Sequence, residues 1–274
     1  MIQRVGFVIH REKPEAEKWA AVAGEAFSQC GVQTMILNGE ERTDFNPDMI
    51  VTFGGDGTFL NGAHYAMDYC VPLLGINLGT VGFLTEEEPE KIPQAVEAIL
   101  RNDCQLEERS LLQIDGFDAG FRQLALNDAV ITRGGYARLI RVESFINDEM
   151  YSVFTADGII VATPTGSTGY SLSAGGPLIE PDMNCMIITP VCPHSLYQRP
   201  CVVSGHSAIK LRLSEDRSQS AELQIDGKSR LKLRAGEEIM ITGSEKTLKL
   251  VRLRQFEFFN ILRKKLTEWG SQHG

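Results

Sequence analysis

The sequence predicts an α/β N-terminal domain with a mostly parallel sheet, followed by an all-β, sandwich-like C-terminal domain. Residues 1–102 alternate short apolar runs with segments of helical periodicity, whereas residues 103–255 alternate apolar and polar residues with a period of two. Residues 256–270 return to helical periodicity. An isolated helix of this length is marginal in water, so we expect it to dock onto and complete the first domain.

Four apolar runs in the first domain predict strands, at residues 5–10, 34–37, 49–53 and 71–76. Apolar residues at helical spacing predict helices over residues 14–30, 59–67 and 89–101. Gly31 stands where a helix commonly ends. Because strands and helices alternate along the chain, we expect a parallel sheet covered by helices.

Period-two patterns in the second domain predict strands at residues 124–132, 137–146, 150–156, 159–163 and 208–213. Asn147-Asp148 and Asp226-Gly227 lie between such runs and predict β-hairpin turns. Long helical patterns are absent from this part of the sequence. The pattern therefore favours an antiparallel sandwich or stacked sheets.

Composition excludes several classes of protein. The 274 residues carry a net charge of −9, which argues against a general nucleic-acid binder. No apolar stretch approaches the ~20 residues needed to span a bilayer, and the first residues look like a strand rather than a signal peptide. We therefore expect a cytoplasmic protein with no nucleic-acid or membrane partner. The six cysteines form no CxxC pair, so we expect buried free thiols and no metal site.

A glycine-rich turn, Gly54-Gly55-Asp56-Gly57-Thr58, follows the apolar run at residues 49–53. Glycines let a polyanion approach the backbone, and a helix that begins here would offer free N–H groups to phosphate. The single carboxylate, Asp56, is unusual in a phosphate cradle unless it holds a metal or takes a proton. This suggests phosphoryl transfer, although the pentapeptide alone is equally consistent with a structural turn.

A second segment, residues 157–177, is the most informative part of the sequence. A predicted strand at residues 159–162 runs into Thr163-Pro164-Thr165-Gly166-Ser167-Thr168-Gly169, whose hydroxyls and glycines can wrap a sugar and phosphates. Tyr170 adds a ring that packs either against a base or in the core. The sequence contains no GxGxxG fingerprint, and Glu222 stands where a P-loop ending at Lys228-Ser229 needs its first glycine.

These segments together resemble the NAD kinase family. The resemblance rests on the glycine turn, on Asn127-Asp128, on residues 157–177, and on residues 189–190 and 193–196. It extends from near residue 1 to residues 258–263. The long motif at 157–177 is specific, whereas diacylglycerol, sphingosine and phosphofructo-kinases share the glycine turn.

The resemblance implies a NAD kinase/diacylglycerol kinase-like fold and transfer of the γ-phosphoryl of ATP to the 2′-hydroxyl of the adenosine ribose of NAD. It also implies Mg²⁺ that arrives with ATP, no tightly bound cofactor, and a homodimer or homotetramer. Asp56 matches the family's proton acceptor. The residues that match NAD contacts are Gly57, Asn127, Asp128, Arg138, Thr155, Asp157, Thr168, Gly169, Tyr170, Ser171, Leu172 and Ser173. Arg138 and Thr155 match by their offset alone.

Three positions depart from the family pattern. Asp128 replaces a glutamate, Gly169 replaces an alanine, and Lys228 replaces a glutamine. Two alternatives remain open: a diacylglycerol-type lipid kinase and a non-catalytic sensor that binds NAD or NADP. The lipid-kinase hypothesis gives no reason for the loop at residues 163–177, and the intact Asp56 argues against a sensor.

Overall fold

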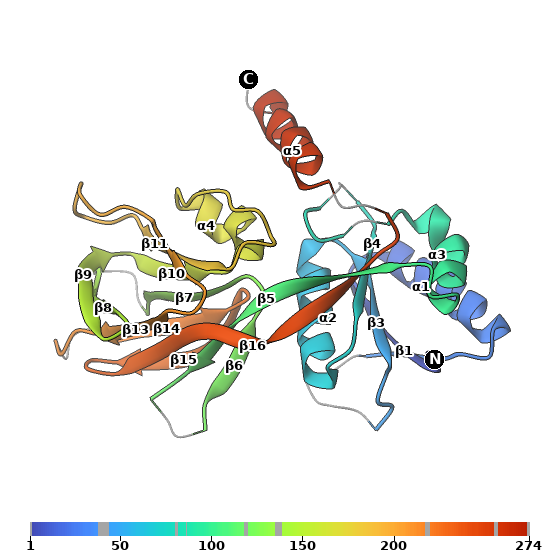
Figure 1. Ribbon diagram of the computed structural model, residues 1–274, viewed down its shortest axis with the longest axis horizontal. Coiled ribbons are helices and arrows are strands. Elements are labelled where there is room, and N and C mark those ends of the chain that lie inside the picture. Colours follow the sequence, from blue (N-terminus) through green and yellow to red (C-terminus); the bar gives the residue numbers. More distant parts are fainter. Residues whose placement is uncertain are drawn as a thin grey trace. The chain divides into compact units, whose positions relative to one another are not determined.

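The computed structural model describes residues 2–37, 44–79, 82–85, 87–117, 120–134, 139–216, 220–254 and 257–272. The chain divides into two compact units. The first unit comprises Met1–Glu108 and Leu248–Gly274, and the second comprises Arg109–Thr247. Strand β16 (Glu238–Arg252) begins in the second unit and ends in the first (Figure 1).

The first unit is built on a parallel sheet of β1 (Arg4–Ile9), β2 (Gln33–Ile36), β3 (Met49–Gly54) and β4 (Leu73–Asn77). Their order is β2-β1-β3-β4, and the end of β16 pairs in parallel with β4. The chain crosses to β2 on one side of β1 and then to β3 on the other. Ligands of open α/β sheets bind at the carboxyl ends of the strands at such a reversal.

Helices cover both faces of this sheet (Figure 1). Helices α1 (Pro14–Gln29) and α3 (Ile92–Leu100), the latter preceded by the 3₁₀ turn η1 (Pro89–Lys91), share an apolar core with β1, β3 and β4. Helix α2 (Asp56–Tyr69) packs on the opposite face, where a Cβ on Gly62 would meet Thr52, Leu73 and Ile50 side chains. The predicted α/β architecture is therefore confirmed for this unit.

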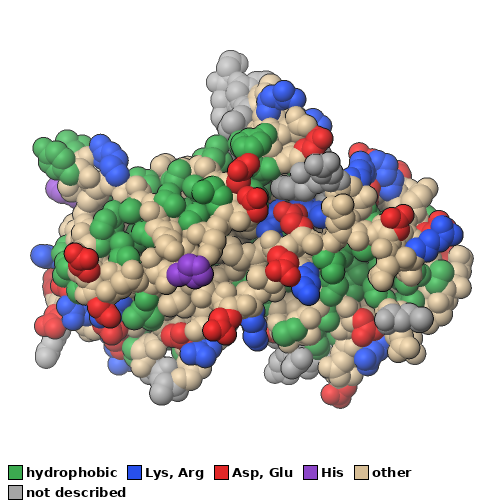
Figure 2. All heavy atoms as spheres, viewed as in Figure 1, with side chains coloured by type: hydrophobic (Ala, Val, Ile, Leu, Met, Phe, Trp, Pro, Cys, Tyr) green, Lys and Arg blue, Asp and Glu red, His purple; other side chains and the backbone are tan. Residues whose placement is uncertain are grey.

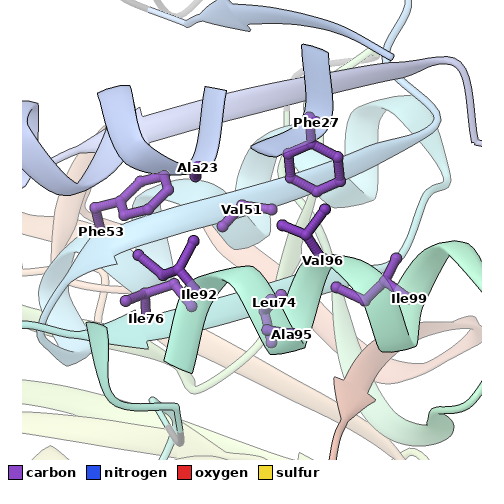
Figure 3. A pocket seen from close by; sticks show the side chains of 10 residues that line it. All are labelled: Ala23, Phe27, Val51, Phe53, Leu74, Ile76, Ile92, Ala95, Val96 and Ile99. Carbon is purple, nitrogen blue, oxygen red and sulfur yellow. The ribbon is translucent and has the colours of Figure 1, made fainter. Parts of the chain in front are cut away.

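A small apolar cavity lies in the core under α1 and α3 (Figure 3). Its volume of about 10 Å³ corresponds to a single water molecule. It is lined by Ala23, Phe27, Val51, Phe53, Leu74, Ile76, Ile92, Ala95, Val96 and Ile99. Because none of these side chains is polar, we regard the cavity as a packing feature and not as a ligand site.

The second unit is an antiparallel β sandwich. One sheet has the order β12-β11-β10-β7-β14-β15, and the other contains β9, β8, β13 and the start of β16, with β5 and β6 paired beside them. Buried side chains of both sheets form one apolar cluster. The bounds are β5 (Gln105–Asp115), β6 (Arg122–Ala125), β7 (Asp128–Arg133), β8 (Ile140–Ile146), β9 (Glu149–Ala156), β10 (Gly158–Ala162), β11 (Cys185–Val191), β12 (Cys201–Ser204), β13 (Ala208–Leu213), β14 (Ser220–Ile225) and β15 (Lys228–Arg234).

Both predicted hairpin turns are confirmed. Asn147 and Asp148 have φ of 52° and 64°, and Asp226 and Gly227 have φ of 48° and 75°. Two consecutive positive φ angles are the signature of a type I′ turn, which fits the twist of antiparallel strands. The turns join β8 to β9 and β14 to β15.

Two predicted elements next to the candidate residues have different bounds in the structure. The helix expected at residues 59–67 begins at Asp56, because the glycine turn itself supplies its first residues. The strand expected at residues 124–132 is wrong as a single element: β6 ends at Ala125 and β7 begins at Asp128. The C-terminal segment forms α5 (Phe258–Gln272), and Lys265 on this helix lies over the ring of Phe83.

The six cysteines are free thiols. The expectation that they are buried is wrong for Cys30, Cys70 and Cys192, which are exposed. Cys30 and Cys70 are the C-caps of α1 and α2, and helix ends reach the surface. Among the described helices, none is long and apolar enough to cross a membrane. On the face shown in Figure 2, Lys and Arg side chains are interspersed with Asp and Glu side chains.

Candidate functional site

The first group of candidate residues lies at the carboxyl end of β3. The strand ends at Gly54, Gly55 is the N-cap of α2, and Asp56 is the first residue of the helix. The Asp56 carboxylate is half-buried and accepts the N–H groups of Phe83 and Leu84, each at 3.3 Å. These bonds fix its orientation beside the free N–H groups of α2, which favour an anionic ligand.

The glycines of this turn have different physical roles. A Cβ on Gly54 would lie 2.3 Å from Oγ1 of Thr58, so this position has no room for a side chain. A Cβ on Gly55 or Gly57 would meet no atom of the described residues within 4 Å. The fold therefore requires Gly54, whereas Gly55 and Gly57 leave the backbone open to a ligand.

Other polar groups follow the ends of β1 and β4. The ammonium of Lys13 donates to the carbonyl oxygen of Leu78 at 3.2 Å, and the side-chain amide of Asn77 donates to the carbonyl oxygen of Gly79 at 3.2 Å. The Asn77 Oδ1 is buried, with no hydrogen-bond partner among the described residues. This edge of the sheet thus carries a positive charge and an unused acceptor near the start of α2, neither of which sequence reasoning singled out.

Gly82 restricts the space around Asp56. A Cβ on Gly82 would lie 2.0 Å from Oδ1 of Asp56 and 2.7 Å from its Cγ. We expect Gly82→Ala to displace the Asp56 carboxylate and to lower kcat by about 10-fold or more in any reaction in which Asp56 takes part, because small misplacements of a reacting group are costly. Steady-state kinetics would measure this. Gly79→Ala is the matched control, since among the described residues its Cβ would meet only the flexible Lys13 ammonium, at 3.5 Å. Equal kcat values for the two variants would contradict the prediction.

The second group of candidate residues lies where β6 passes into β7. Thr163 binds this connection twice: its N–H donates to the carbonyl oxygen of Asn127 at 2.9 Å, and its hydroxyl donates to that of Leu126 at 2.6 Å. A Cβ on Gly166 would lie 2.1 Å from the Asn127 carbonyl oxygen. The Asn127 Oδ1 is buried without a hydrogen-bond partner in the described part of the chain. The structure therefore brings Asn127 against the loop at residues 163–169.

Asp128 lies beside this connection, but its side chain is only 6% exposed. Burial, with repulsion from Asp226, raises the pKa of Asp128 to about 7. Burial also raises the pKa of Asp226, although three backbone N–H donors and the charge of Arg230 oppose this increase. Because those donors favour the ionised form of Asp226, the proton of this carboxyl pair belongs on Asp128.

The Asp128 pKa makes stability pH-dependent. In the unfolded chain the carboxyl loses its proton near pH 4, whereas the folded protein keeps it up to about pH 7. Folding therefore becomes less favourable as pH rises between these values and is constant above them. We expect the free energy of unfolding of Asp128→Asn to rise by about 2 kcal/mol relative to that of the parent protein when the pH is raised from 5 to 8. Urea denaturation at both pH values measures this, and a pH-independent difference would contradict it.

The loop at residues 163–173 uses several of its hydroxyls internally. It contains the 3₁₀ turn η2 (Thr165–Thr168) and the short helix α4 (Tyr170–Ser173). The Ser167 hydroxyl contacts the backbone of Ile179 at 3.2 Å, and Ser171 and Thr189 share a buried hydrogen bond of 2.9 Å. Tyr170 is 44% exposed, so the alternative that it is a core ring is wrong.

The remaining hydrogen bonds explain how the loop keeps its shape. Thr168 donates its hydroxyl to the carbonyl oxygen of Thr165 at 3.2 Å. Gly169 donates its N–H to the carbonyl oxygen of Gly166, and Leu172 donates to Gly169. Ser173 is exposed at the end of α4. Hydrogen bonds within the loop and to residues outside it thus hold its shape, and its exposed side chains are those of Tyr170 and Ser173.

Asp157 and Thr155 do not join Asn127. Asp157 precedes β10 and forms an ion pair of 3.2 Å with Arg133, whereas Thr163 follows the other end of this strand. Five residues of β10 separate the two ends, about 17 Å of extended chain. The carbonyl oxygen of Thr155 on β9 accepts the N–H of His194 at 2.9 Å. Arg138 lies outside the described residues.

Within the described ranges, no three His, Cys, Asp or Glu side chains gather as ligands for a metal ion. The carboxylates at the two candidate sites are Asp56, which is bound by backbone N–H groups, and the Asp128–Asp226 pair, which is buried. This donor set suits a metal that arrives on a phosphate ligand better than one held in a protein cage.

Besides Lys13 and Asn77, sequence reasoning missed two further features of these sites. The N–H groups that hold Asp56 come from residues 83 and 84, and the carboxylate that holds residues 126–128 is Asp226. The Asp-Gly pair at 226–227 was visible as a turn signal, but a turn signal does not reveal that the carboxylate points inward.

Family models match both parts of the chain. A model described as the ATP-NAD kinase N-terminal domain matches residues 5–104, and one described as the ATP-NAD kinase C-terminal domain matches residues 126–253. The chain is 38% identical over 282 residues to a NAD kinase of Ruminiclostridium cellulolyticum, covering 97% of this chain and 99% of that protein. It is 42% identical over 229 residues to a NAD kinase of Geotalea daltonii, covering 82% and 80% respectively.

Solved structures give the same picture. A NAD kinase from Archaeoglobus fulgidus in complex with ATP superposes with a TM-score of 0.77 at 27% identity, covering 97% of this chain and 99% of that one. Yeast NADH kinase complexed with NADH has a TM-score of 0.85 at 24% identity, covering 97% and 88%. The second likeness bears on the fold alone.

Proposed function

The chain belongs to the NAD kinase family, and we propose that it carries out the family's reaction with Asp56 as the group that accepts the proton of the attacking hydroxyl. The protein is a phosphotransferase. It transfers the γ-phosphoryl of ATP to the 2′-hydroxyl of the adenosine ribose of NAD and gives NADP and ADP. The observation that carries this function is the 38% identity to a NAD kinase over nearly the full length of both chains.

Asp56 suits its proposed role because its carboxylate can accept further hydrogen bonds. Each carboxylate oxygen has two acceptor sites, and the N–H groups of Phe83 and Leu84 occupy one site on each oxygen. A ribose hydroxyl can therefore bind without displacing either donor. The hydroxyl oxygen attacks the γ-phosphorus, and the bond between the γ-phosphorus and the oxygen that bridges the β- and γ-phosphates breaks, which releases ADP. The proton of the hydroxyl passes to Asp56.

The start of α2 is proposed to receive the phosphates of ATP. Its first N–H groups have no acceptor among the described residues, and Gly55 and Gly57 have no side chain to obstruct a ligand. Mg²⁺ bound to ATP would neutralise charge on the transferred group. Within the chain, Gly54 and Thr58 shape the turn, and Asp56 orients the ribose hydroxyl that receives the phosphoryl group.

The second unit is proposed to bind NAD. The unused Oδ1 of Asn127 and the exposed ring of Tyr170 support this, because they offer an acceptor and a stacking surface. We assign the other NAD contacts, at Asp128, Thr155, Asp157, Arg138 and residues 168–173, on the family match alone. We further propose a cytoplasmic homodimer or homotetramer.

The test incubates purified protein with NAD, ATP and Mg²⁺ and measures NADP with an NADP-specific dehydrogenase. Formation of NADP that requires both substrates is the expected result. The relatives do not favour a diacylglycerol-type lipid kinase or a non-catalytic sensor. Phosphorylation of diacylglycerol, or tight NADP binding with no turnover, would overturn the assignment.

A further inference from the structure

A buried carboxylate holds the backbone on which Asn127 stands. Asp226, 6% exposed, accepts the N–H groups of Leu126, Asn127 and Asp128 at 2.9, 2.7 and 3.2 Å. Its own N–H donates to the carbonyl oxygen of Asp128 at 3.0 Å. Four hydrogen bonds thus join the β14–β15 turn to the connection between β6 and β7.

The hairpin turn alone does not require this arrangement. In the turn at Asn147-Asp148, Asn147 takes the position of Asp226, but it is exposed and, among the described residues, its side chain accepts a single backbone N–H, that of Ala208 at 2.9 Å. A buried carboxylate is unfavourable unless its hydrogen bonds are satisfied. The three N–H donors supply these bonds to Asp226, so the buried charge and the conformation of residues 126–128 depend on each other.

Asn127 is fixed from two sides. Asp226 binds its N–H, and the N–H of Thr163 binds its carbonyl oxygen at 2.9 Å. The backbone of Gly166 packs so closely against this carbonyl that a Cβ would lie 2.1 Å away. With its peptide groups occupied, the side-chain amide is the part of Asn127 that is left to act, and its Oδ1 has no hydrogen-bond partner among the described residues.

We propose that Asp226 is a positioning residue for NAD binding, which acts by holding the peptide groups of residues 126–128 so that the Asn127 amide is aimed at the dinucleotide. This inference rests on the proposed function, because it takes NAD as the ligand of Asn127. Asp226 itself does not contact NAD. The charged groups that act on its carboxylate include Asp128 of β7 and Arg230 of β15.

The test compares Asp226→Asn with the parent protein. Asparagine keeps the size of the side chain and favours the left-handed turn, but it lacks the charge and one acceptor oxygen. We expect the Kd for NAD, measured by isothermal titration calorimetry without ATP, to rise about 10- to 100-fold. The Kd for ATP should stay within about twofold. Asp148→Asn, an exposed aspartate in the matching turn, is the control and should change neither Kd.

Hydrogen exchange provides a second, local measurement. The amides of residues 126–128 should exchange faster in Asp226→Asn, whereas those of Val130 and Ile131 inside β7 should not change. A variant that carries both Asn127→Ala and Asp226→Asn should bind NAD about as weakly as Asn127→Ala alone, because Asp226 acts through Asn127.

The outcomes separate the two proposals. If the parent protein does not bind NAD, the proposed function fails. If the parent binds NAD and Asp226→Asn binds it equally well, or loses ATP affinity to the same extent, the role of Asp226 is wrong. If Asp226→Asn does not fold, Asp226→Glu replaces it: this variant keeps the charge, moves it by one methylene, and should weaken NAD binding with ATP binding unchanged.

Discussion

Asp56→Asn is expected to lower kcat by about 10²–10⁴, the usual contribution of a general base. The amide oxygen can still accept one backbone N–H, but the amide has no basic site to take the proton of the ribose hydroxyl. Because the substitution nearly preserves size, NAD should still bind. The expected pattern is therefore a large fall in kcat with a small change in the Kd for NAD, measured by steady-state kinetics and by calorimetry.

Asp148→Asn serves as the control for loss of one carboxylate, since this side chain is 88% exposed and distant in sequence from the glycine turn. It should have parental kcat. If Asp56→Asn retained near-parental turnover, Asp56 would have no place in the mechanism, while membership of the family would stand.

Gly166→Ala is expected to have the second large effect. The new methyl group would lie 2.1 Å from the carbonyl oxygen, 2.6 Å from the carbonyl carbon and 2.9 Å from the Cα of Asn127. All three are backbone atoms of a connection held by hydrogen bonds, so they cannot move aside cheaply. We expect NAD affinity to fall by at least about 10-fold and stability to fall by about 1–3 kcal/mol.

Thermal unfolding and calorimetric titration with NAD measure these two losses. Gly169→Ala is the control for stability, because its Cβ would lie 3.3 Å from the nearest atom, the Gly166 carbonyl oxygen, and should shift the unfolding temperature little. Equal unfolding temperatures for the two variants would mean that the backbone around Gly166 moves to make room for the methyl group. The close packing there would then be unimportant for stability.

Local patterns were sufficient to predict much of the fold. The alternation of apolar runs and helical periodicity identified β3 and α2 around the glycine turn, because both depend on residues near in sequence. Asn147-Asp148 and Asp226-Gly227 identified their turns because few residues tolerate positive φ. The predicted strand at 124–132 failed because apolar residues stand on both sides of Asn127-Asp128, where the backbone passes from one sheet to the other.

The missing information is long-range. Asp226 binds residues 98 to 100 positions earlier in the chain, and no local pattern reports such a contact. Likewise, the requirement for glycine at Gly82 arises from its distance to Asp56, 26 positions earlier. Sequence motifs could therefore indicate which segments carry the chemistry, whereas the groups that hold those segments in place became visible only in three dimensions.

Strand β16 brings the chain back into the first unit, and this affects which fragments of the protein can fold by themselves. Leu250 pairs with Leu73 at the edge of the parallel sheet, and Arg254 forms an ion pair with Glu87, whose side chain is only 4% exposed. A fragment that ended at residue 108 would lack both partners and would leave a buried carboxylate uncompensated, at a cost of about 3–5 kcal/mol. Expression of the N-terminal half by itself should therefore yield an insoluble or unfolded product, and a separable module would have to carry the last 27 residues fused back onto it.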